Sequence, residues 1–196
     1  MKAYTSNNIR NIAVLGHGGK GKTTLCEAML YIAGASDRLG RVADGNTVLD
    51  FDSEEKRRKS SVSSAIAALE WDNTKLNIID APGLFDFEGG AAEAVRAAEA
   101  VLIVTSAGSG VDVGTEKAFR AAEKKGAAKF FAVTKTDSDH RNFYKTFDAL
   151  KEVYGNKLCP TIIPYMEGNI TKCYVNLMTG MAFSYDENGK ATKVPV

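Results

Sequence analysis

The stretch Gly16-His17-Gly18-Gly19-Lys20-Gly21-Lys22-Thr23 decides the fold of this 196-residue chain. It fits the pattern G-x-x-x-x-G-K-[ST] without a mismatch, follows the apolar run 11–15 and opens the apolar-periodic segment 22–33. In this context, glycines allow backbone N–H groups to surround phosphate oxygens, and the helix N-terminus adds partial positive charge. The motif therefore predicts a phosphate-binding loop between a strand and a helix.

The polar residues of this loop have expected roles. We expect Lys22 to neutralise the β- and γ-phosphates of a nucleotide, the Thr23 hydroxyl to coordinate Mg²⁺, and Thr24 to reach the α-phosphate. The alternative is a glycine-rich turn that binds nothing, and the match of both motif and context argues against it. The predicted phosphate-binding residues are Gly16, His17, Gly18, Gly19, Lys20, Gly21, Lys22, Thr23 and Thr24.

A second element of a phosphate site follows in the chain. Asp80-Ala81-Pro82-Gly83 comes directly after the strand pattern 75–80. An aspartate at such a strand end can hold Mg²⁺, usually through a water, and the N–H of Gly83 can bind the γ-phosphate. Alone, D-x-P-G is equally consistent with an ordinary turn. Downstream of the Lys22 loop, it predicts the second half of a phosphate–Mg²⁺ site.

A candidate base site lies at Thr134-Lys135-Thr136-Asp137, which closes the apolar run 130–134. A carboxylate at Asp137 can accept hydrogen bonds from both guanine donors, the N1–H and the exocyclic amine, whereas adenine presents an acceptor at N1. A buried mismatch of this kind can discriminate by about 10⁴ or more. The stem of Lys135 can lie across the base. The alternative is a polar loop that simply follows a strand.

Strand-like and helix-like segments alternate along the chain, which is typical of a three-layer α/β fold with a mostly parallel sheet. The segments 64–71 and 75–80 flank the turn signal 72–74 and predict a hairpin with one antiparallel strand. The charge run 54–59 predicts a solvated mobile loop. The expected strands are 11–15, 64–71, 75–80, 101–105, 130–134, 159–165, 172–176 and 181–185, and the expected helices are 22–33, 91–100, 115–125 and 141–154.

The composition excludes several classes of protein. A net charge of +1 gives no bulk attraction to nucleic acid, and we expect no sequence-specific DNA binding. The sequence has no apolar signal segment, and no apolar run approaches the ~18 residues of a membrane span, so we expect no membrane partner. Three scattered cysteines form neither a disulfide framework nor a zinc spacing, which favours reduced thiols in a cytoplasmic protein.

Taken together, the motifs resemble the GTP-binding domain of the elongation factor G family of translational GTPases, and most closely its elongation factor G-like and ribosomal-protection members. The resemblance implies a P-loop NTPase fold of the Ras-like GTPase type, GTP or GDP and Mg²⁺ as ligands, and the ribosome as a partner of domains outside this chain. It spans 9–165 and is carried by 10–25, 50–63, 77–83, 86–87, 108–117 and 134–137.

The resemblance also implies a domain organisation. Residues 1–158 would be the GTP-binding domain and 159–196 the opening of the antiparallel insert subdomain that the family carries within it. The family's last guanine loop, a Ser-Ala motif after that insert, does not occur, so we read the chain as part of a longer protein. The last strand of the sheet would be missing too. We therefore expect 130–134 to be an unpaired apolar edge that favours self-association and weak nucleotide binding.

Three departures from the family pattern concern the site. Ser61 stands where the family has a threonine that binds Mg²⁺ and the γ-phosphate, so the implied metal-binding residues are Thr23, Ser61 and Asp80. Leu84 stands where a histidine orients the attacking water, and leucine cannot hydrogen-bond to water. Thr134 replaces an asparagine that braces the phosphate loop, and the shorter side chain is expected to brace it less firmly.

Two other functions remain open at this point. The phosphate loop also resembles that of partition-type ATPases, although those have a lysine where this chain has His17, and Asp137 would then have no role. A GTP-binding switch with little or no hydrolysis is the second, and Leu84 favours it. For the GTPase interpretation, Lys22 and the altered position Leu84 are the catalytic candidates. We expect the segment 35–60 to be mobile without nucleotide.

Overall fold

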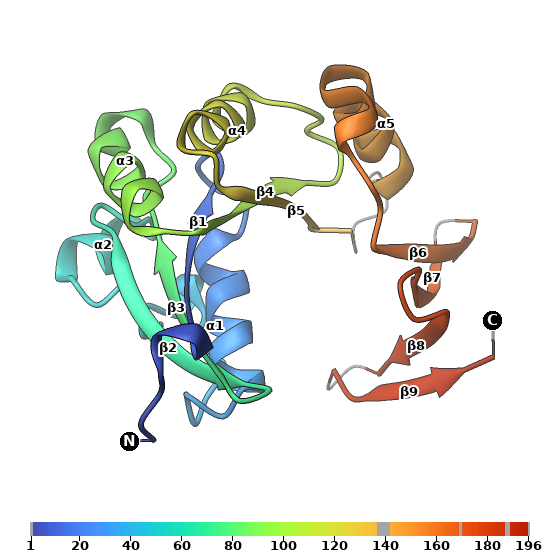
Figure 1. Ribbon diagram of the computed structural model, residues 1–196, viewed down its shortest axis with the longest axis horizontal. Helices are drawn as coiled ribbons and strands as arrows, with labels where there is room; N and C mark the ends of the chain where they lie inside the picture. The colour runs from blue at the N-terminus through green and yellow to red at the C-terminus, as the bar shows by residue number, and fades with distance from the viewer. Residues whose placement is uncertain (1, 137–141, 169, 187–188, 196) are drawn as a thin grey trace. The chain divides into compact units, whose positions relative to one another are not determined.

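The computed structural model describes residues 2–136, 142–168, 170–186 and 189–195, and it forms two compact units (Figure 1). The first unit comprises 1–106 and 111–134, and the second comprises 107–110 and 135–196. These units separate after Thr134 rather than at residue 158. The division into a GTP-binding domain and an insert subdomain at residue 158 stays a prediction.

The first unit is built on a five-stranded sheet with the strand order β2-β3-β1-β4-β5. Strands β3, β1, β4 and β5 are parallel, and β2 pairs antiparallel with β3, as the hairpin pattern predicts. Among the described residues β5 lies at one edge, where Phe130 is 58% exposed, so the expected edge is present. Self-association through it stays a prediction. The strands are β1 (Ile9–Leu15), β2 (Ala65–Trp71), β3 (Thr74–Asp80), β4 (Ala100–Ser106) and β5 (Ala128–Thr134).

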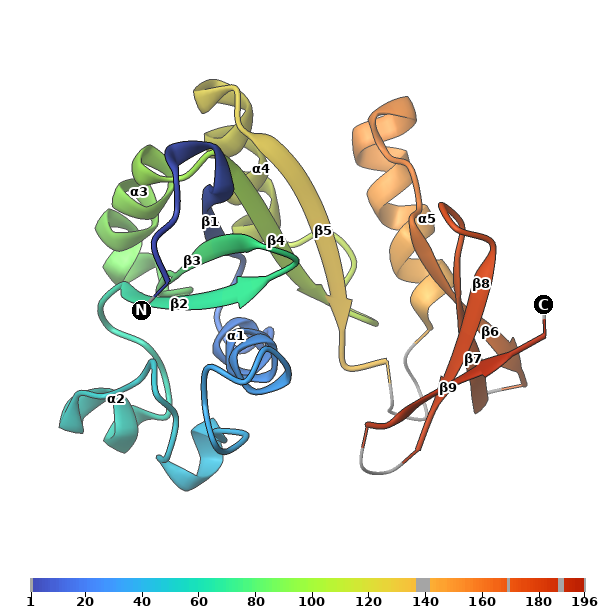
Figure 2. The ribbon, with the colours of Figure 1, turned by 60° about the horizontal axis from the view of Figure 1, so that its bottom comes forward.

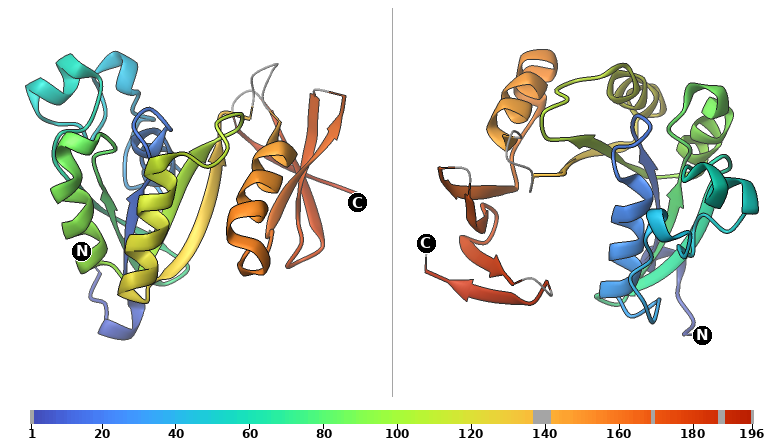
Figure 3. Two further views of the ribbon diagram at one scale, coloured as in Figure 1. Left: turned by 90° about the horizontal axis from the view of Figure 1, so that it is seen from above. Right: turned by 180° about the vertical axis from the view of Figure 1, so that it is seen from behind.

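Helices cover both faces of this sheet and complete the three layers. Helix α1 (Lys22–Ile32) lies on one face, and α3 (Glu88–Ala97) and α4 (Val113–Lys125) lie side by side on the other (Figures 1 and 3). The helix predicted at 91–100 starts and ends earlier, because Ala98 is already extended and leads into β4. None of the described helices is long and apolar enough to cross a membrane.

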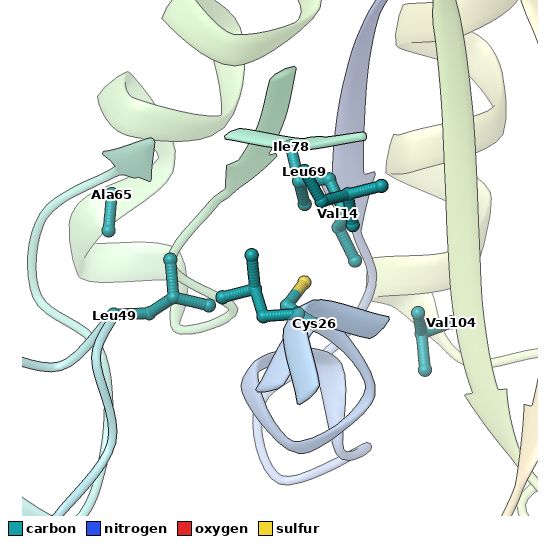
Figure 4. Packing of buried hydrophobic residues seen from close by; sticks show 8 residues of the cluster. Val14, Cys26, Leu49, Ala65, Leu69, Ile78 and Val104 are labelled. Carbon is teal, nitrogen blue, oxygen red and sulfur yellow. The ribbon is translucent and has the colours of Figure 1, made fainter. Parts of the chain in front are cut away.

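A hydrophobic core lies between α1 and the sheet. Leu49, from the segment before α2 (Ser53–Arg58), points into this core toward α1, which carries Cys26 (Figure 4). Burial raises the pKa of the Cys26 thiol far above its usual range, so this cysteine is a neutral core residue. The buried members of the core are Val14, Cys26, Leu30, Leu49, Ala65, Leu69, Ile78 and Val104.

The charge run that suggested a mobile loop instead forms the short helix α2 (Ser53–Arg58). Asp52 accepts a hydrogen bond from the Glu54 N–H, and the Glu55 side chain returns to the Asp52 N–H in a capping box. Glu54 also pairs with Arg57 and Arg58, one helical turn later. The capping box and these short-range pairs offset the intrinsic weakness of such a short polar helix. That interpretation of the charge run was therefore wrong.

The second unit contains α5 (Phe143–Tyr154) and a four-stranded antiparallel sheet in the order β6-β7-β8-β9 (Figure 2). Asn142 caps α5, and the Tyr144 hydroxyl donates to the Pro164 carbonyl at 2.6 Å, which ties the helix to the sheet. The strands are β6 (Ile162–Glu167), β7 (Ile170–Asn176), β8 (Met181–Tyr185) and β9 (Ala191–Val194), of which the sequence pattern missed β9.

The core makes a direct prediction about stability. Ile78 is fully buried in β3, so Ile78→Ala should lower the free energy of unfolding by about 2–5 kcal/mol, through lost burial and the cavity left behind. The matched control is Ile66→Ala on β2, where the side chain is 70% exposed and the expected change is about 0.5 kcal/mol or less. Urea unfolding of both variants would measure this. Equal losses would contradict the described core.

Candidate phosphate and metal site

The phosphate loop occupies the turn between the end of β1 and the start of α1. Gly16, Gly19 and Gly21 all have positive φ, a backbone conformation that residues other than glycine rarely adopt. A Cβ at Gly16 would also overlap the carbonyl oxygen of Val104 on the neighbouring strand β4. The glycines of the motif are therefore required by the backbone path, which brings the start of α1 to the carboxyl end of the sheet.

Lys22 is the first residue of α1 and is only 6% exposed. Its Nζ donates to the His17 carbonyl at 3.1 Å. A Cβ at Gly83 would overlap this Nζ, so the D-x-P-G turn lies directly against the lysine, as predicted. Burial lowers the pKa of the Lys22 ammonium, and the charge of Asp80 acts in the opposite direction. The phosphate loop and the Asp80 turn form one site.

A chain of hydroxyls and carboxylates lies beside Lys22. The Thr23 hydroxyl donates to Asp80 Oδ2 at 2.6 Å, and the Ser61 hydroxyl donates to Asp50 Oδ1 at 2.7 Å. The two hydroxyl oxygens lie 3.2 Å apart. The three residues expected to bind metal, Thr23, Ser61 and Asp80, are thus brought together, and Asp50 joins them.

The protons of these hydroxyls indicate what the cluster can bind. Each hydroxyl has a single proton. When Thr23 gives its proton to Asp80 and Ser61 gives its proton to Asp50, the two facing oxygens have only lone pairs left for each other. Adjacent oxygens on an octahedral Mg²⁺ are about 3 Å apart, given Mg–O distances of 2.0–2.1 Å. The spacing of the Thr23 and Ser61 oxygens fits two ligands of one such cation.

The carboxylates of the cluster also fit a cation. Asp80 is 1% exposed, and its Oδ1 has no hydrogen-bond partner among the described residues. Burial raises the pKa of Asp80 to about 7, against the opposing effects of Thr23 and Lys22, and burial likewise raises the pKa of Asp50. No group of three or more His, Cys, Asp or Glu able to hold a metal occurs in the described ranges. Hydroxyls, few carboxylates and phosphate oxygens are the ligands typical of nucleotide-bound Mg²⁺.

Leu84 lies over the phosphate loop. A Cβ at Gly18 would come within 2.9 Å of Leu84 Cδ2, so the leucine side chain covers that glycine. The next residue, Phe85, packs edge-on against His17 at 5.3 Å between ring centroids, and Lys117 Nζ lies 4.6 Å from the Phe85 centroid. These contacts hold the residue after Leu84 against the phosphate loop and α4. A mainly apolar cavity lined by Leu84 and Phe85 extends between α3 and α4.

Lys20 contacts a protein carboxylate. Its Nζ lies 3.1 Å from Asp112 Oδ2, and both side chains are mostly buried. Asp112 also caps α4 by accepting hydrogen bonds from the N–H and the hydroxyl of Thr115. The Lys20–Asp112 pair therefore ties the phosphate loop to α4. A direct role of Lys20 at a nucleotide stays a prediction, as does that of Thr24, which is exposed on the first turn of α1.

Thr134 reaches the phosphate loop in spite of its short side chain. Its Oγ1 lies 2.7 Å from the Lys20 carbonyl and 3.1 Å from the Thr105 carbonyl, so the hydroxyl can donate to either. The expected brace is therefore present. Lys135 belongs to the second unit, which is described by itself, and Asp137 lies outside the described residues. The base site stays a prediction.

Sequence reasoning missed three acidic residues of this region. Asp50 binds Ser61, Glu27 of α1 binds the backbone just before Asp50, and Glu55 binds the backbone just after Ser61. Asp50 and Glu55 lie in the family-like stretch 50–63, but no motif assigns a role in the site to them or to Glu27, because their partners are backbone groups or hydroxyls that only folding brings close. Burial in the folded structure is what identifies them.

Comparison with known proteins identifies the family. The model of the elongation factor Tu GTP-binding domain matches residues 7–195. The chain belongs to this family. It is 34% identical to an elongation factor G-like protein from Mycobacterium tuberculosis, over 95% of this chain and 26% of that protein. A protein of the same description from Synechocystis is 30% identical, over 99% of this chain and 29% of that protein.

A solved structure agrees with this assignment. The crystal structure of a protein from Thermus thermophilus superposes with a TM-score of 0.89 at 38% identity, over 96% of this chain and 28% of that one. The chain thus spans less than a third of the length of these relatives. It is a P-loop GTPase domain of the elongation factor G-like translational GTPases.

The contact of Asp50 with Ser61 leads to a test of the Mg²⁺ site expected at this cluster. Asp50→Ala removes the acceptor that orients the Ser61 hydroxyl, and losing a partner that orients a metal ligand typically weakens metal affinity by about 10- to 100-fold. The Mg²⁺ concentration that half-saturates binding of a non-hydrolysable GTP analogue should rise accordingly, in a fluorescence titration. Asp44→Ala, at an exposed aspartate of the same segment, is the control. An unchanged Mg²⁺ requirement in Asp50→Ala would contradict this role.

Proposed function

We propose that this domain binds GTP with Mg²⁺, hydrolyses it, and drives a conformational switch of a translation factor on the ribosome. The observation that carries the proposal is the cluster of Thr23, Ser61, Asp80 and Asp50 beside the buried Lys22. Cation ligands, a buried ammonium and a glycine loop at one helix start are what a nucleoside triphosphate requires.

The chain's own residues divide the work of binding. The N–H groups of the phosphate loop and the Lys22 ammonium would bind the β- and γ-phosphates. The phosphate oxygens would then take the place of the His17 carbonyl as acceptors for Lys22. Thr23 and Ser61 would hold Mg²⁺ directly, and Asp80 would do so through a water. Bound Mg²⁺ would supply positive charge at the phosphate oxygens. The Gly83 N–H would bind the γ-phosphate.

We place guanine recognition at Asp137, with Lys135 across the base and Thr134 bracing the phosphate loop. The Thr134 contact with the Lys20 carbonyl supports the last of these roles. A ribosomal partner, contacted by domains beyond this chain, is supported by the names of relatives that are elongation factor G-like proteins. A location in the cytoplasm fits that partner.

Catalysis needs a water in line with the γ-phosphate, and positioning supplies most of the rate. The Leu84 side chain covers Gly18, so an apolar group lies beside the phosphate loop where a water-orienting side chain is needed. This favours a slow intrinsic GTPase, or one whose missing group comes from a partner. A GTP-binding switch with little hydrolysis is the second candidate function, and the same contact supports it.

The rate of phosphate release tests this proposal. The full-length protein and its Leu84→His variant would be compared under multiple turnover, with and without ribosomes, and Leu84→Met would control for the change of side chain. We expect the parent and Leu84→Met to hydrolyse GTP about 10²–10⁴-fold more slowly than Leu84→His without ribosomes. A parent as fast as Leu84→His would show that Leu84 is no defect. An absence of GTP binding would refute the function itself.

A further inference from the structure

Glu27 is a buried carboxylate without an obvious purpose in phosphate binding. It lies on α1 one helical turn after Thr23 and is 0% exposed. Its Oε1 accepts hydrogen bonds from the N–H groups of Val48 at 2.7 Å and Leu49 at 3.0 Å. These two residues directly precede Asp50.

Glu55 forms a second arrangement of the same kind. It lies on α2 and is 3% exposed. Its Oε1 accepts from the N–H groups of Val62 at 2.9 Å and Ser63 at 3.1 Å, while its Oε2 accepts from the Asp52 N–H at 3.3 Å. Val62 and Ser63 directly follow Ser61. The two residues of this segment that reach the metal cluster are thus each flanked by a backbone pair that a buried glutamate holds.

Because both glutamates are buried acids, each depends on the hydrogen bonds that it accepts. Neither forms a salt bridge with a lysine or arginine within the described ranges. A buried carboxylate requires donors, and the described donors to both glutamates are backbone N–H groups, while Glu27 Oε2 has no partner among the described residues. A Cβ at Gly40 would overlap Glu27 Oε2, so the chain leaves room for this carboxylate. Displacing the segment would remove those donors.

The two stretches of backbone that the glutamates bind are also joined to each other. The hydrogen bond from Ser61 to Asp50 joins the part of the segment that Glu27 holds to the part that Glu55 holds. Thr23, which lies one turn before Glu27 on the same face of α1, contacts Ser61. The face of α1 formed by Thr23 and Glu27 therefore carries both the cation site and the anchor of the segment that completes it.

We propose that Glu27 and Glu55 are positioning residues that hold Asp50 and Ser61 in the arrangement that binds Mg²⁺ and the γ-phosphate. The preference of the domain for GTP over GDP would then depend on the hydrogen bonds between these glutamates and the backbone of 48–63. This inference rests on the proposed function. Both glutamates bind the backbone of the segment that carries Asp50 and Ser61, and neither binds the phosphate loop by a hydrogen bond among the described residues. Loss of either one should therefore weaken the GTP complex selectively and leave the binding of GDP by the phosphate loop largely intact.

The test compares two nucleotides with the full-length protein. Fluorescent GDP and a fluorescent non-hydrolysable GTP analogue would be titrated, with Mg²⁺, against the parent, Glu27→Ala and Glu55→Ala. We expect each variant to bind the GTP analogue about 10- to 100-fold more weakly and to bind GDP within about threefold of the parent. Glu54→Ala is the matched control, since Glu54 lies next to Glu55 and its side chain pairs with Arg57 and Arg58 at the surface.

The conservative variant separates positioning from simple stability. Glu27→Gln keeps an acceptor oxygen and should bind the GTP analogue more tightly than Glu27→Ala does. Equal losses for GDP and the analogue, or no loss for either, would overturn the inference. A parent that shows no Mg²⁺-dependent binding of the analogue would instead overturn the proposed function, and this inference with it.

A measurement on the unmodified protein remains decisive if an alanine variant does not fold. Hydrogen exchange at the Val48, Leu49, Val62 and Ser63 amides should be slower with the GTP analogue and Mg²⁺ than with GDP. Binding of Mg²⁺ by Ser61 would stabilise the arrangement in which the glutamates accept from these N–H groups. Equal exchange rates in the two complexes would overturn the inference.

Discussion

The site depends on the hydrogen bond from the Thr23 hydroxyl to Asp80. It joins the first turn of α1 to the end of β3, so it fixes the phosphate loop relative to the D-x-P-G turn. It also uses the only proton of Thr23, which leaves that oxygen able to bind a cation. Ser61, oriented in the same way by Asp50, supplies a second oxygen at 3.2 Å. Removing either carboxylate would free the proton of that hydroxyl to point toward the proposed cation position.

Close backbone packing keeps this arrangement in place. Gly16 allows β1 to approach Val104, Gly83 allows the D-x-P-G turn to touch Lys22, and Gly114 allows α4 to abut His17. Each of these positions has no room for a Cβ, so the spacing of glycines reflects contacts between distant segments. Leu84 also lies against this loop, because its Cδ2 would come within 2.9 Å of a Cβ at Gly18, although 39% of the leucine remains exposed.

Much of the fold and of the phosphate site could be predicted from the sequence. The phosphate loop has a pattern fixed by backbone geometry, and the hairpin is indicated by its turn, so the sheet and the position of the Asp80 turn beside the loop were predicted correctly, while phosphate and metal binding stay predictions. Asp50, Glu27 and Glu55 were missed, because each acts on groups that only folding brings close. The charge run at α2 was wrongly predicted to be a loop, because a charge pattern indicates exposure to solvent but not the capping box that stabilises a helix here. Thr134 reaches the Lys20 carbonyl because β5 ends close to the loop, and a weaker brace than asparagine would give stays a prediction.

The central claim is that the Thr23 cluster becomes a Mg²⁺ site once a guanine nucleoside triphosphate is bound. Isothermal titration calorimetry of the full-length protein with GTP and with ATP, each in Mg²⁺ and in EDTA, tests it most directly. The account predicts that GTP binds at least about tenfold more tightly in Mg²⁺ than in EDTA, since coordination by Thr23 and Ser61 is then gained. It also predicts no measurable binding of ATP. Binding of ATP as tight as that of GTP, or GTP binding that is indifferent to EDTA, would contradict it.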